Sequence, residues 1–572
     1  MRLKSGSFKL NLYDRLFTDD AYYYFCDNDE EEKSSKIYFE LENFSKCVLN
    51  KITHIKNFKF EQGSVMINDT DKKNIEEINK RSPFEELNNY DKDIIWTHRY
   101  KLAYEPDYLA NVLLCIDFSN QKHLIELEKI LEIAKPLDTK KCIELLNGKY
   151  IHESIRNFAV KCLRECSPNI EIQEFLYELI HGLRYEVNHD NELARFLLEK
   201  AVNYPVTIGH SFYWYLKSQM YEQNFQQRFG LYLEIFLNKI GPNLTKIFYD
   251  EDILMTSLQE MSQTHLGNKH KQKDKVHLFE ESIKAYNEKM ESDVSLPINF
   301  KYRIKKINSE KCKVQIESGK HVKLIMSFEN DDKLGDELLV KYYDDQDLRT
   351  NLITMQLFNI LHTIWCEKKA QIKMPLYDVI TTGRNRGMIK LIPTSVSYES
   401  IYNLKNFNLK KYLTNITGLP EEMIFQNFMT SLVAYSLGNY IFGITQRNKR
   451  NIHIQNDAKI FYTSYEHLLD HYNKMFGNRG EYFYISKYFI EYFGGEKGNK
   501  MKEFKNKFKD AYIILRNEGR DIVNLFRMLL SSGFPEISKK SIKLLDITLC
   551  LSKSEQEAVK SIQDAINYVM KK

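Results

Sequence analysis

The chain is poor in proline and tryptophan and carries almost no excess charge of either sign. Its 572 residues include 11 prolines and 3 tryptophans, and 82 basic residues nearly offset 78 acidic ones, which leaves a net charge of +4. A charge this small demands no nucleic-acid partner. The nine cysteines form no C-x-x-C pair. This pattern is typical of a reducing compartment and indicates neither a structural zinc site nor a disulfide framework.

Long apolar runs are also missing. The longest, about residues 429–444, is interrupted by Ser436, Gly438 and Asn439, so it predicts a core helix and not a membrane span. The first residues lack the apolar segment of a signal peptide. We therefore expect a cytoplasmic protein without a transmembrane segment. In contrast, 43% of the residues are hydrophobic and 13% aromatic, enough for large cores in roughly three domains.

Hydrophobic periodicity separates a short strand-like region from a long helical one. Residues 8–13 and 37–42 alternate apolar and polar side chains, as strands do. From 84 to 267, apolar residues recur at three- and four-residue spacing in segments with short connections. Successive helix pairs of this kind predict an α-solenoid.

The pattern changes again after residue 267. Residues 268–275 are basic and polar and predict a linker. A helix is expected at 276–290, followed by strands between 300 and 392 with a helix at 351–368 embedded among them. The rest of the chain is mostly helical. A strand-rich lobe followed by a helical lobe is the order found in bilobal kinases.

Two runs in the C-terminal part carry a specific resemblance. Residues 443–452 read GITQRNKRNI and residues 461–467 read FYTSYEH. They resemble the catalytic loop and the metal-binding motif of phosphoinositide 3-kinases, G-I-G-D-R-H-N-x-N-I and F-H-I-D-F-G-H. Further runs resemble the accessory (PIK) helical domain of that family, with a glycine-histidine pair closer to class I enzymes; they are residues 92–100, 156–163, 208–218 and 227–234.

The resemblance implies a mainly α fold with an α+β kinase part. An α-solenoid is followed by a bilobal domain of the phosphatidylinositol 3- and 4-kinase type. The implied domains are a partial C2-like β region at 1–83, the PIK helical domain at 84–267, the basic linker at 268–275, the kinase N-lobe at 276–394 and the C-lobe at 395–572.

The resemblance also implies an ATP site. Residues 317–320 read ESGK and match the phosphate loop of the family, with Ser318 and Lys320 as its polar members. Lys341 matches the lysine that contacts the nucleotide phosphates, and the backbone near Ile392 would face adenine. A plain hairpin turn and an exposed lysine at a strand end are the alternatives.

The catalytic loop departs from the family pattern. Gln446, Asn448 and Lys449 replace an aspartate, a histidine and an asparagine, whereas Arg447 and Asn451 are retained. In the family, the histidine serves the lipid hydroxyl and the later asparagine helps to hold Mg²⁺. Because asparagine accepts no proton at neutral pH, Asn448 cannot be a general base, and the loss of a base costs roughly 10²–10⁴ in rate.

The implied metal site is altered as well. Ser464 stands where the family has the aspartate that binds Mg²⁺, and a neutral hydroxyl is a poor ligand for this cation. Glu466 is a carboxylate that could rescue binding, about 6.5 Å away at strand rise. Lys449 and Arg450 add positive charge that could partly replace the metal. Asn351 replaces another family aspartate, which weakens the network expected to position Lys341.

The lipid site is reduced in the same way. Residues 476–482 read FGNRGEY and offer only Arg479 where class I enzymes carry a basic run that grips the lipid headgroup. The implied partners are a phosphoinositide lipid or membrane surface, met transiently, and a regulatory protein subunit. Three hypotheses follow. The chain is a catalytically impaired phosphoinositide 3-kinase homologue, a divergent but active lipid kinase, or a pseudokinase scaffold that binds partners through its solenoid.

Overall fold

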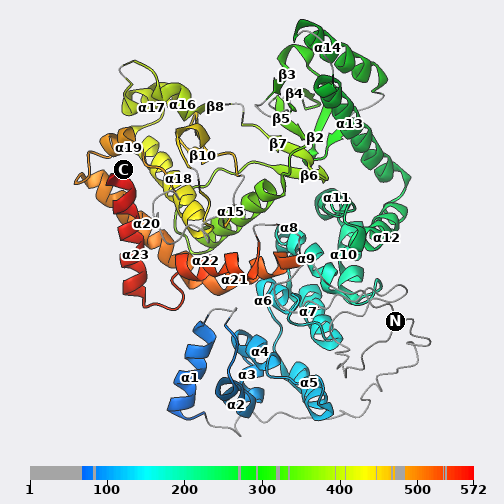
Figure 1. Cartoon of the computed structure of the whole chain (residues 1–572), viewed down its shortest axis with the longest axis vertical. Coiled ribbons are helices and arrows are strands. Elements are labelled where there is room, and N and C mark those ends of the chain that lie inside the picture. Colours follow the sequence, from blue (N-terminus) through cyan, green and yellow to red (C-terminus); the bar gives the residue numbers. More distant parts are fainter. Residues whose placement is uncertain are drawn as a thin grey trace, which may run out of the picture. The chain divides into compact units, whose positions relative to one another are not determined.

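The protein is described here by a computed structural model, which divides into two compact units (Figure 1). The first unit comprises Met1–Glu199 with Arg527–Ser531, and the second Lys200–Phe526 with Ser532–Lys572. The domain boundaries expected from the sequence remain predictions. The structure describes residues 67–81, 85–267, 272–290, 294–316, 322–332, 335, 337–392, 394–405, 407–445, 447–465, 468–469, 483–531, 534 and 537–571. The strand-like region expected near the start lies outside them.

The regular secondary structure described in the first unit is all helical. Polar residues start several of its helices: Asn88 forms a reciprocal capping box with Asp91, and the Asp138 side chain accepts a hydrogen bond from the Lys141 N–H. The helices are α1 (Asp69–Lys80), α2 (Asn89–Thr97), α3 (Arg99–Ala103), α4 (Pro106–Leu113), α5 (Gln121–Ile133), α6 (Thr139–Leu145), α7 (Glu153–Cys166), α8 (Asn169–Glu174) and α9 (Leu176–Gly182).

A buried arginine ties α7 to the segment that follows α9. The Arg156 guanidinium lies 2.6 Å from Glu186, and both side chains are buried. It also donates to the carbonyl oxygens of Leu146 and Gly182 at 2.8 and 2.9 Å. A buried guanidinium with this many acceptors is fully compensated, so it fixes the packing of these helices.

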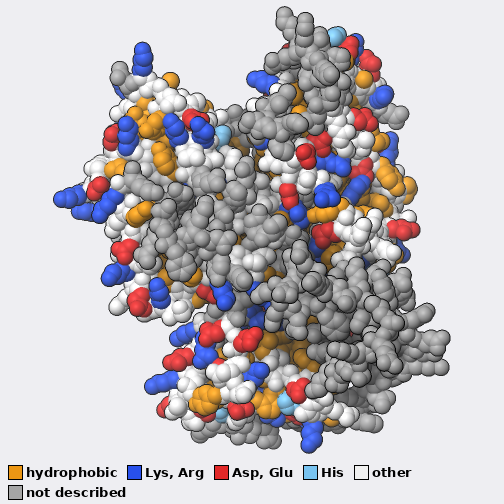
Figure 2. Space-filling view, in the orientation of Figure 1, with side chains coloured by type: hydrophobic (Ala, Val, Ile, Leu, Met, Phe, Trp, Pro, Cys, Tyr) orange, Lys and Arg blue, Asp and Glu red, His pale blue; other side chains and the backbone are white. Residues whose placement is uncertain are grey.

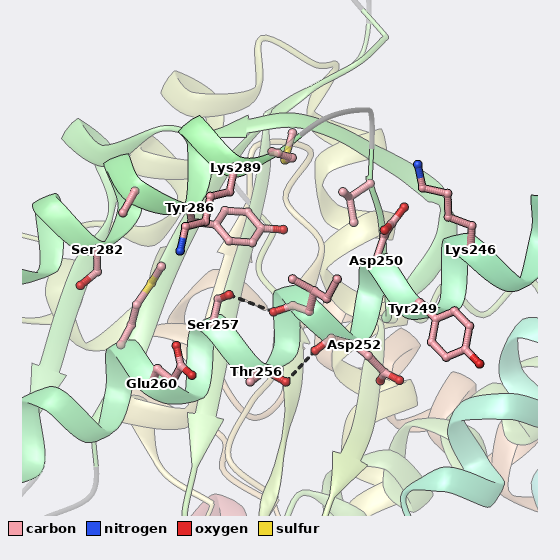
Figure 3. Close-up of a pocket in the computed structure, with 15 residues that line it drawn as sticks. Lys246, Tyr249, Asp250, Asp252, Thr256, Ser257, Glu260, Ser282, Tyr286 and Lys289 are labelled. Carbon is pink, nitrogen blue, oxygen red and sulfur yellow. Dashed lines mark hydrogen bonds between the residues drawn. The ribbon is translucent and has the colours of Figure 1, made fainter.

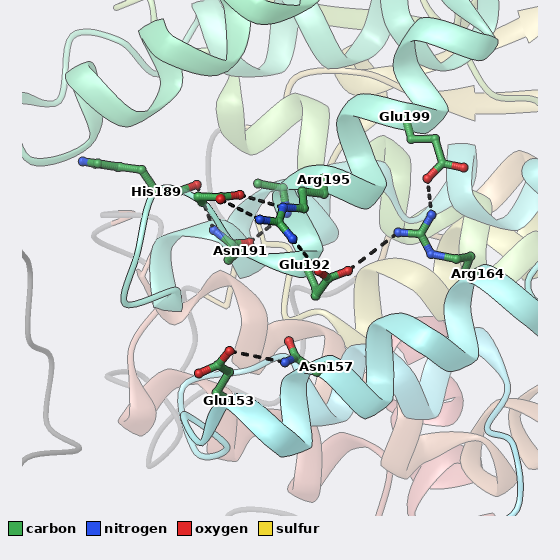
Figure 4. A network of polar contacts seen from close by, with 10 residues as sticks. Glu153, Asn157, Arg164, His189, Asn191, Glu192, Arg195 and Glu199 are labelled. Atoms are coloured by element: carbon green, nitrogen blue, oxygen red, sulfur yellow. Dashed lines mark hydrogen bonds and ion pairs between the residues drawn. The ribbon is translucent and has the colours of Figure 1, made fainter. Parts of the chain in front are cut away.

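The ion pairs on the surface of this unit contribute less. Figure 4 shows Arg164 of α7 between Glu192 and Glu199. Arg195 pairs with neighbours of its own, such as Asp190 at 2.6 Å. These side chains are exposed, and such pairs are typically worth only about 0–1 kcal/mol each. The core of this unit therefore depends on apolar packing and on Arg156.

The second unit begins with helices that lead into a sheet. Helix α10 (Glu192–Asn203) starts in the first unit and ends in the second. It is followed by a π-helical turn, η3 (Pro205–Gly209), and the later helices are α11 (His210–Lys217), α12 (Gln223–Ile240), α13 (Pro242–Gly267) and α14 (Gln272–Lys289). The sequence placed residues 272–275 in a linker, but they form the first turn of α14. The expected order, a helical region followed by a sheet-containing domain, is confirmed.

The main sheet is antiparallel and has seven strands. Its order is β1-β2-β4-β5-β7-β6, with β3 paired to β4. Helix α15 (Arg349–Glu367) lies between β5 and β6 in the chain. The strands are β1 (Val294–Leu296), β2 (Asn299–Ile307), β3 (Lys313–Ile316), β4 (Val322–Asn330), β5 (Leu338–Asp344), β6 (Val379–Gly383) and β7 (Arg386–Lys390).

The two faces of this sheet differ in burial. Side chains alternate between the faces along each strand. Helix α13 packs on β4 and β5. One face of these two strands is fully buried and carries the side chains of Leu324, Met326, Val340 and Tyr342. The opposite face carries Ile325 and Lys341, which are only half-buried. This less covered face is therefore the one available to a ligand.

A second sheet of three strands joins the helical C-terminal part. Its order is β10-β9-β8, and all pairs are antiparallel. The strands and helices are β8 (Ser395–Ser397), α16 (Tyr398–Tyr402), α17 (Leu409–Thr417), α18 (Glu421–Ile441), η5 (Lys449–Asn451), β9 (Ile452–Gln455), β10 (Ile460–Tyr462), α19 (Lys487–Tyr492), α20 (Asn499–Asn517), α21 (Gly519–Met528), α22 (Lys539–Thr548) and α23 (Glu555–Lys571).

Helix α18 is the core helix of this part. It is buried on all sides from Asn427 to Ile441, as expected of a helix without a polar face. A Cβ atom at Gly438 would lie 2.6 Å from the Phe358 ring, so glycine is needed where α15 and α18 cross. Among the described residues, none of the helices combines the length and apolar character needed to cross a bilayer. On the face seen in Figure 2, basic and acidic side chains are interspersed.

A buried carboxylate joins the helices of the second unit to the sheet. Glu251 of α13 is fully buried and accepts hydrogen bonds from Trp214 Nε1 at 2.7 Å, from His210 Nε2 at 3.1 Å and from the Ser295 hydroxyl. Its donors come from α11 and β1. A charged acceptor with three donors is stabilising only as a complete set.

We expect Glu251→Leu to destabilise the second unit by roughly 3–5 kcal/mol, because it leaves buried donors without an acceptor. The measurement is urea unfolding followed by tryptophan fluorescence. Asp252→Asn is the matched control, since Asp252 is partly exposed and pairs with Lys217; we expect a change below about 1 kcal/mol. Equal effects of the two variants would contradict the assignment.

The first unit contains a buried carboxyl group that titrates near neutrality. Glu178 on α9 is 1% exposed, and burial raises its pKa from 4.5 to about 7. A raised carboxyl pKa favours the protonated folded state, so this contribution to stability is present at low pH and is lost as pH rises from about 4.5 to 7.

We therefore expect Glu178→Gln to raise the unfolding temperature at pH 8 and to change it little at pH 4.5. The gain at pH 8 is on the order of 3 kcal/mol, from about 1.4 kcal/mol for each pKa unit. Thermal unfolding at both pH values tests this. The exposed Glu165 of α7 provides the control, Glu165→Gln. A gain that is the same at both pH values would show that titration is not its cause.

Candidate active site

The half-buried face of the main sheet holds the predicted nucleotide lysine. Lys341 lies in the middle of β5, opposite Ile325 of β4 and Ile389 of β7. It is therefore not a lysine at a strand end. Its Nζ atom lies 5.5 Å from the centre of the Tyr343 ring, two residues further along the same face.

The segment after β7 connects the two sheets. The N–H of Leu391 donates to the Leu339 carbonyl at 2.8 Å, which extends the pairing of β7 with β5. The next residue, Ile392, is half-buried, and its carbonyl accepts a hydrogen bond from the Ser395 hydroxyl at 2.7 Å. The chain then enters β8. The adenine contact expected near Ile392 remains a prediction.

The side chain of Lys390 points away from the half-buried face. Its register partner is Val340, which belongs to the buried face. The Lys390 ammonium lies 4.0 Å from the centre of the Tyr302 ring and bonds the Tyr302 hydroxyl, which in turn donates to Asp378 at 3.0 Å. Lys390 thus stabilises the sheet and is directed away from the face that carries Lys341.

Strands β9 and β10 of the second sheet carry aromatic side chains, one of which lies near Lys341. His453 of β9 pairs with Phe461 of β10, and their rings stack at 5.1 Å. Burial, and then the positive charge of Lys341, lower the pKa of His453 to about 4. The His453 ring therefore lies close to Lys341 and is neutral at pH 7. Tyr377 packs edge-on against Phe461 at 6.0 Å, and burial and Tyr343 raise its pKa.

The predicted catalytic loop follows α18. Gly443 has φ 57°, and a Cβ atom there would lie 2.3 Å from Leu544, so only glycine fits. Asn448 caps the turn η5: its side chain accepts from the Arg450 N–H at 2.8 Å. The Asn451 side chain accepts from the Asn448 N–H at 3.3 Å. Both amide oxygens are thus bonded to the backbone of their own loop.

Arg447 joins this loop to the predicted metal-binding turn. It is 9% exposed and donates to the carbonyls of Thr463 and Ser464 at 3.0 and 2.6 Å. It also donates to the Thr445 carbonyl at 2.9 Å, and its guanidinium lies 5.1 Å from the centre of the Tyr465 ring. One side chain therefore sets the position of both loops.

The turn at Ser464 is held from a second side. The N–H of Tyr465 donates to the Asn351 side chain of α15 at 3.3 Å, and Asn351 is buried. The fully buried Tyr465 ring packs edge-on against Phe358 at 5.5 Å. Between these contacts, Ser464 is exposed and has φ 63°, in the left-handed region. The sequence predicted that Asn351 belongs to the network that positions Lys341. In the structure, the Asn351 side chain instead accepts the hydrogen bond from Tyr465 of the turn.

The described part of this site does not fit a magnesium ion. Mg²⁺ binds to proteins through one or two carboxylates, but Ser464 and Asn451 offer only neutral oxygens, and that of Asn451 is already bonded. Asp457 is the one carboxylate among residues 447–465 and is paired with Lys459 at the β9–β10 turn. No group of three or more histidine, cysteine or acidic side chains within the described residues suits a metal.

Lys449 and Arg450 contact α16. The Lys449 Nζ atom lies 4.4 Å from the centre of the Tyr402 ring and 3.5 Å from the Asn403 side-chain oxygen. Arg450 pairs with Glu399 at 3.1 Å. The sequence suggested that these two cations could partly replace a metal ion. In the structure, their contacts hold α16 and Asn403 against the catalytic loop.

Several predicted site residues lie outside the described part of the chain: Ser318, Lys320, Gln446, Glu466 and Arg479. Their roles remain predictions. Of the predicted residues that the structure describes, Arg447 contacts the Ser464 turn and Asn451 contacts Asn448, whereas Lys341 lies near His453 of β9. Sequence reasoning missed Tyr377 and His453, which carry no motif. Alternation along β9 would have placed His453 on one face, but not beside Lys341.

A separate cavity of about 1040 Å³ lies between α13 and α14 (Figure 3). Two of its hydroxyls, those of Thr256 and Ser257, already donate to carbonyls of their own helix, each at 2.9 Å. Its charged lining residues include both acids and lysines. It shares no residue with the site around Lys341 and presents no convergent set of donors to phosphate.

Comparison with known families agrees with the observed architecture. Residues 63–249 match the phosphoinositide 3-kinase family accessory domain (PIK domain), and residues 337–539 match the phosphatidylinositol 3- and 4-kinase domain. The first match falls on the helical region. The second contains β5, the segment after β7, both loops and the Ser464 turn.

Similar proteins from Dictyostelium discoideum extend this likeness. Phosphatidylinositol 3-kinase 1 is 26% identical over 500 residues, which is 84% of this chain and 31% of the relative. Phosphatidylinositol 3-kinases 2 and 3 are 26% and 25% identical over 85% and 82% of this chain. The chain spans less than a third of the length of these relatives, 31%, 27% and 28%. Its fold and both domain matches show that the chain belongs to the phosphatidylinositol 3- and 4-kinase superfamily.

Proposed function

We propose that the chain is a phosphoinositide 3-kinase homologue that binds ATP between its two sheets but transfers phosphate slowly or not at all. The named relatives support a kinase-like function acting on phosphoinositides. Lys341, Ile392 and the neutral wall of His453 and Phe461 support nucleotide binding. The chemistry of transfer is where the residues depart from the family.

The observation that carries this proposal is the Ser464 turn. Arg447 and Asn351 hold the turn in place, and the turn presents a hydroxyl where the family it resembles has a carboxylate. In phosphoryl transfer the metal bridges the phosphates and neutralises developing charge. A turn that presents a hydroxyl supports weak binding of Mg²⁺ and therefore slow transfer.

Asn448 supports the same conclusion. Its side-chain oxygen is occupied by the Arg450 N–H, and an amide takes up no proton at neutral pH. The lipid hydroxyl therefore has no general base at this position. A divergent active kinase would need another base and another metal ligand, such as Glu466. We further propose that the chain acts in the cytoplasm and meets the membrane surface transiently, with Arg479 at the lipid headgroup and a regulatory subunit as a partner.

The direct test measures nucleotide binding and turnover together. We expect ATP to raise the unfolding temperature, and pure protein at high concentration to yield little phosphorylated product from several phosphoinositides. Lys341→Met should weaken ATP binding about 10- to 100-fold, since a hydrogen bond to a charged group is worth about 1.5–3 kcal/mol. Calorimetric titration checks this.

Lys301→Met is the control for this experiment, because Lys301 is exposed on β2 of the same sheet. We expect it to bind ATP as the unaltered chain does. Robust phosphorylation that Lys341→Met abolishes would overturn the impaired-kinase proposal. A complete lack of nucleotide binding would favour the scaffold hypothesis with an empty cleft.

A second prediction concerns the metal. Ser464→Asp should make ATP binding depend on Mg²⁺, with affinity roughly tenfold higher in Mg²⁺ than in EDTA, because a carboxylate is restored on a turn already in place. Aspartate tolerates the left-handed backbone that Ser464 adopts. Ser464→Asn has the same shape without the charge and is the control. The proposal fails if the two variants respond to Mg²⁺ alike. Adding Asn448→His to Ser464→Asp tests whether turnover follows.

A further inference from the structure

The turn between α16 and α17 exposes a leucine and a lysine next to each other. Leu404 is 53% exposed, and Lys405, which follows it, is exposed as well. A single exposed leucine is ordinary on a protein surface. The side chains around this turn therefore decide whether it has a role.

Aromatic rings surround the turn. The rings of Tyr402 and Phe407 lie 5.3 and 5.0 Å from the ring of Tyr488 on α19. Phe407 also packs against Tyr412 of α17, at 6.0 Å between ring centres. All four residues are partly exposed. Tyrosine combines an apolar ring with a polar hydroxyl, which suits it to the boundary between a membrane and water.

Basic side chains lie beside these rings. The Lys449 Nζ atom is 4.4 Å from the centre of the Tyr402 ring, and the Lys487 Nζ atom is 5.0 Å from that of Tyr488. Lys411 is exposed on α17. Figure 2 shows basic side chains next to hydrophobic ones over α16 and α17. We call this surface the α16–α17 patch; it consists of the four rings, Leu404, Lys405, Lys411, Lys449 and Lys487.

Half of the acids on the surrounding elements are bound to cations outside the patch. In the described parts of residues 394–465 and 483–500, the acids are Glu399, Glu421, Glu422, Asp457, Glu491 and Glu496. Three of them form ion pairs: Glu399 with Arg450 at 3.1 Å, Glu421 with Lys410 and Lys500 at 2.8 and 3.3 Å, and Asp457 with Lys459 at 2.5 Å. These carboxylates are therefore already compensated.

The other three acids leave most of the charge of the patch in place. Glu422 accepts a hydrogen bond from Gln426 at 2.9 Å, and Glu496 lies beyond the far end of α19. Glu491 follows Lys487 by one turn of α19 and can offset that lysine. Among the described residues, no acid pairs with Lys405 or Lys411. The patch thus keeps an excess of positive charge around an exposed leucine.

We propose that the α16–α17 patch is a contact surface for an anionic lipid bilayer, with Leu404 inserted between the lipids and the lysines at their headgroups. The inference deepens the transient membrane contact proposed above and rests on it. Anionic membrane surfaces attract clustered lysines, and burial of an apolar side chain adds to this attraction. The exposed leucine favours a bilayer over a nucleic acid, whose phosphate backbone offers no apolar layer. Because Lys449 belongs to the predicted catalytic loop, a bilayer on this patch would lie beside that loop.

The test measures binding of the full chain to vesicles by flotation. The vesicles contain phosphatidylcholine alone, or phosphatidylcholine and phosphatidylserine at about 2:1, without phosphoinositides, so that the proposed headgroup contact of Arg479 is not involved. We expect stronger binding to the phosphatidylserine vesicles, weakened by added salt. Each lysine near such a surface strengthens binding about fivefold, so the double variant Lys405→Glu/Lys411→Glu should weaken it about 25-fold or more.

Leu404→Ser separates the apolar contribution from the charge. It should weaken binding about tenfold and leave the salt dependence unchanged. Lys284→Glu/Lys301→Glu is the control, because it changes the net charge equally at exposed positions on α14 and β2; we expect it to bind as the unaltered chain does. All these side chains are exposed, so the unfolding temperatures should agree.

The outcomes separate this inference from the membrane contact on which it rests. If the chain binds neither kind of vesicle, the proposed membrane contact fails and the inference fails with it. If phosphatidylserine vesicles bind Lys405→Glu/Lys411→Glu as tightly as the unaltered chain, membrane contact stands and the patch is refuted. If the charge variant loses binding but Leu404→Ser does not, the surface is a general site for anions, such as a nucleic acid or an acidic protein, and the bilayer assignment is refuted.

Discussion

The buried guanidinium of Arg447 fixes the geometry of the candidate site, because it bonds the backbone of two loops at once. Its donors reach the carbonyls of Thr463 and Ser464, and its own backbone belongs to the loop after α18. Hydrogen bonds from a buried cation are strong, and a carbonyl left without one costs free energy. Asn351 adds a bond from α15. The turn thus keeps its position independently of which side chain it presents at residue 464.

This independence is what the proposed loss of catalytic chemistry requires, because the shape of the site would then not depend on the side chain at residue 464. Backbone contacts position the turn, whereas metal binding depends on a single carboxylate. Because Arg447 and Asn351 bond backbone atoms of the turn, we expect the same contacts with a carboxylate or a hydroxyl at residue 464. The same holds for Asn448, whose side chain caps η5. An asparagine is well suited to cap a turn and unsuited to accept a proton. The hydrogen bonds that stabilise the turn at Ser464 involve its backbone atoms, whereas metal binding would depend on its side chain.

Much of the fold could be predicted from the sequence, because periodicity and motif spacing are local. The helical region, the later sheet and the core helix α18 all follow from them. Contacts between distant segments do not follow from local periodicity or motif spacing. The proximity of His453 to Lys341 depends on how two sheets face each other, and the contact of Asn351 with Tyr465 joins positions 114 residues apart. The start of α14 was missed because Gln272 and its charged neighbours are typical of a linker; the apolar positions of this helix that are buried, Phe279 and Ile283, come later.

The alternation of β5 connects these observations. Its even-numbered positions, Val340 and Tyr342, are buried beneath α13, so its odd-numbered positions must form the wall of the cleft. A shift of register by one residue would bury Lys341 and expose Tyr342, which the apolar core opposes. Burial on one face thus dictates where positive charge appears on the other. The strand that completes the core also places Lys341 on the opposite face, where its Nζ atom lies 5.5 Å from the centre of the Tyr343 ring.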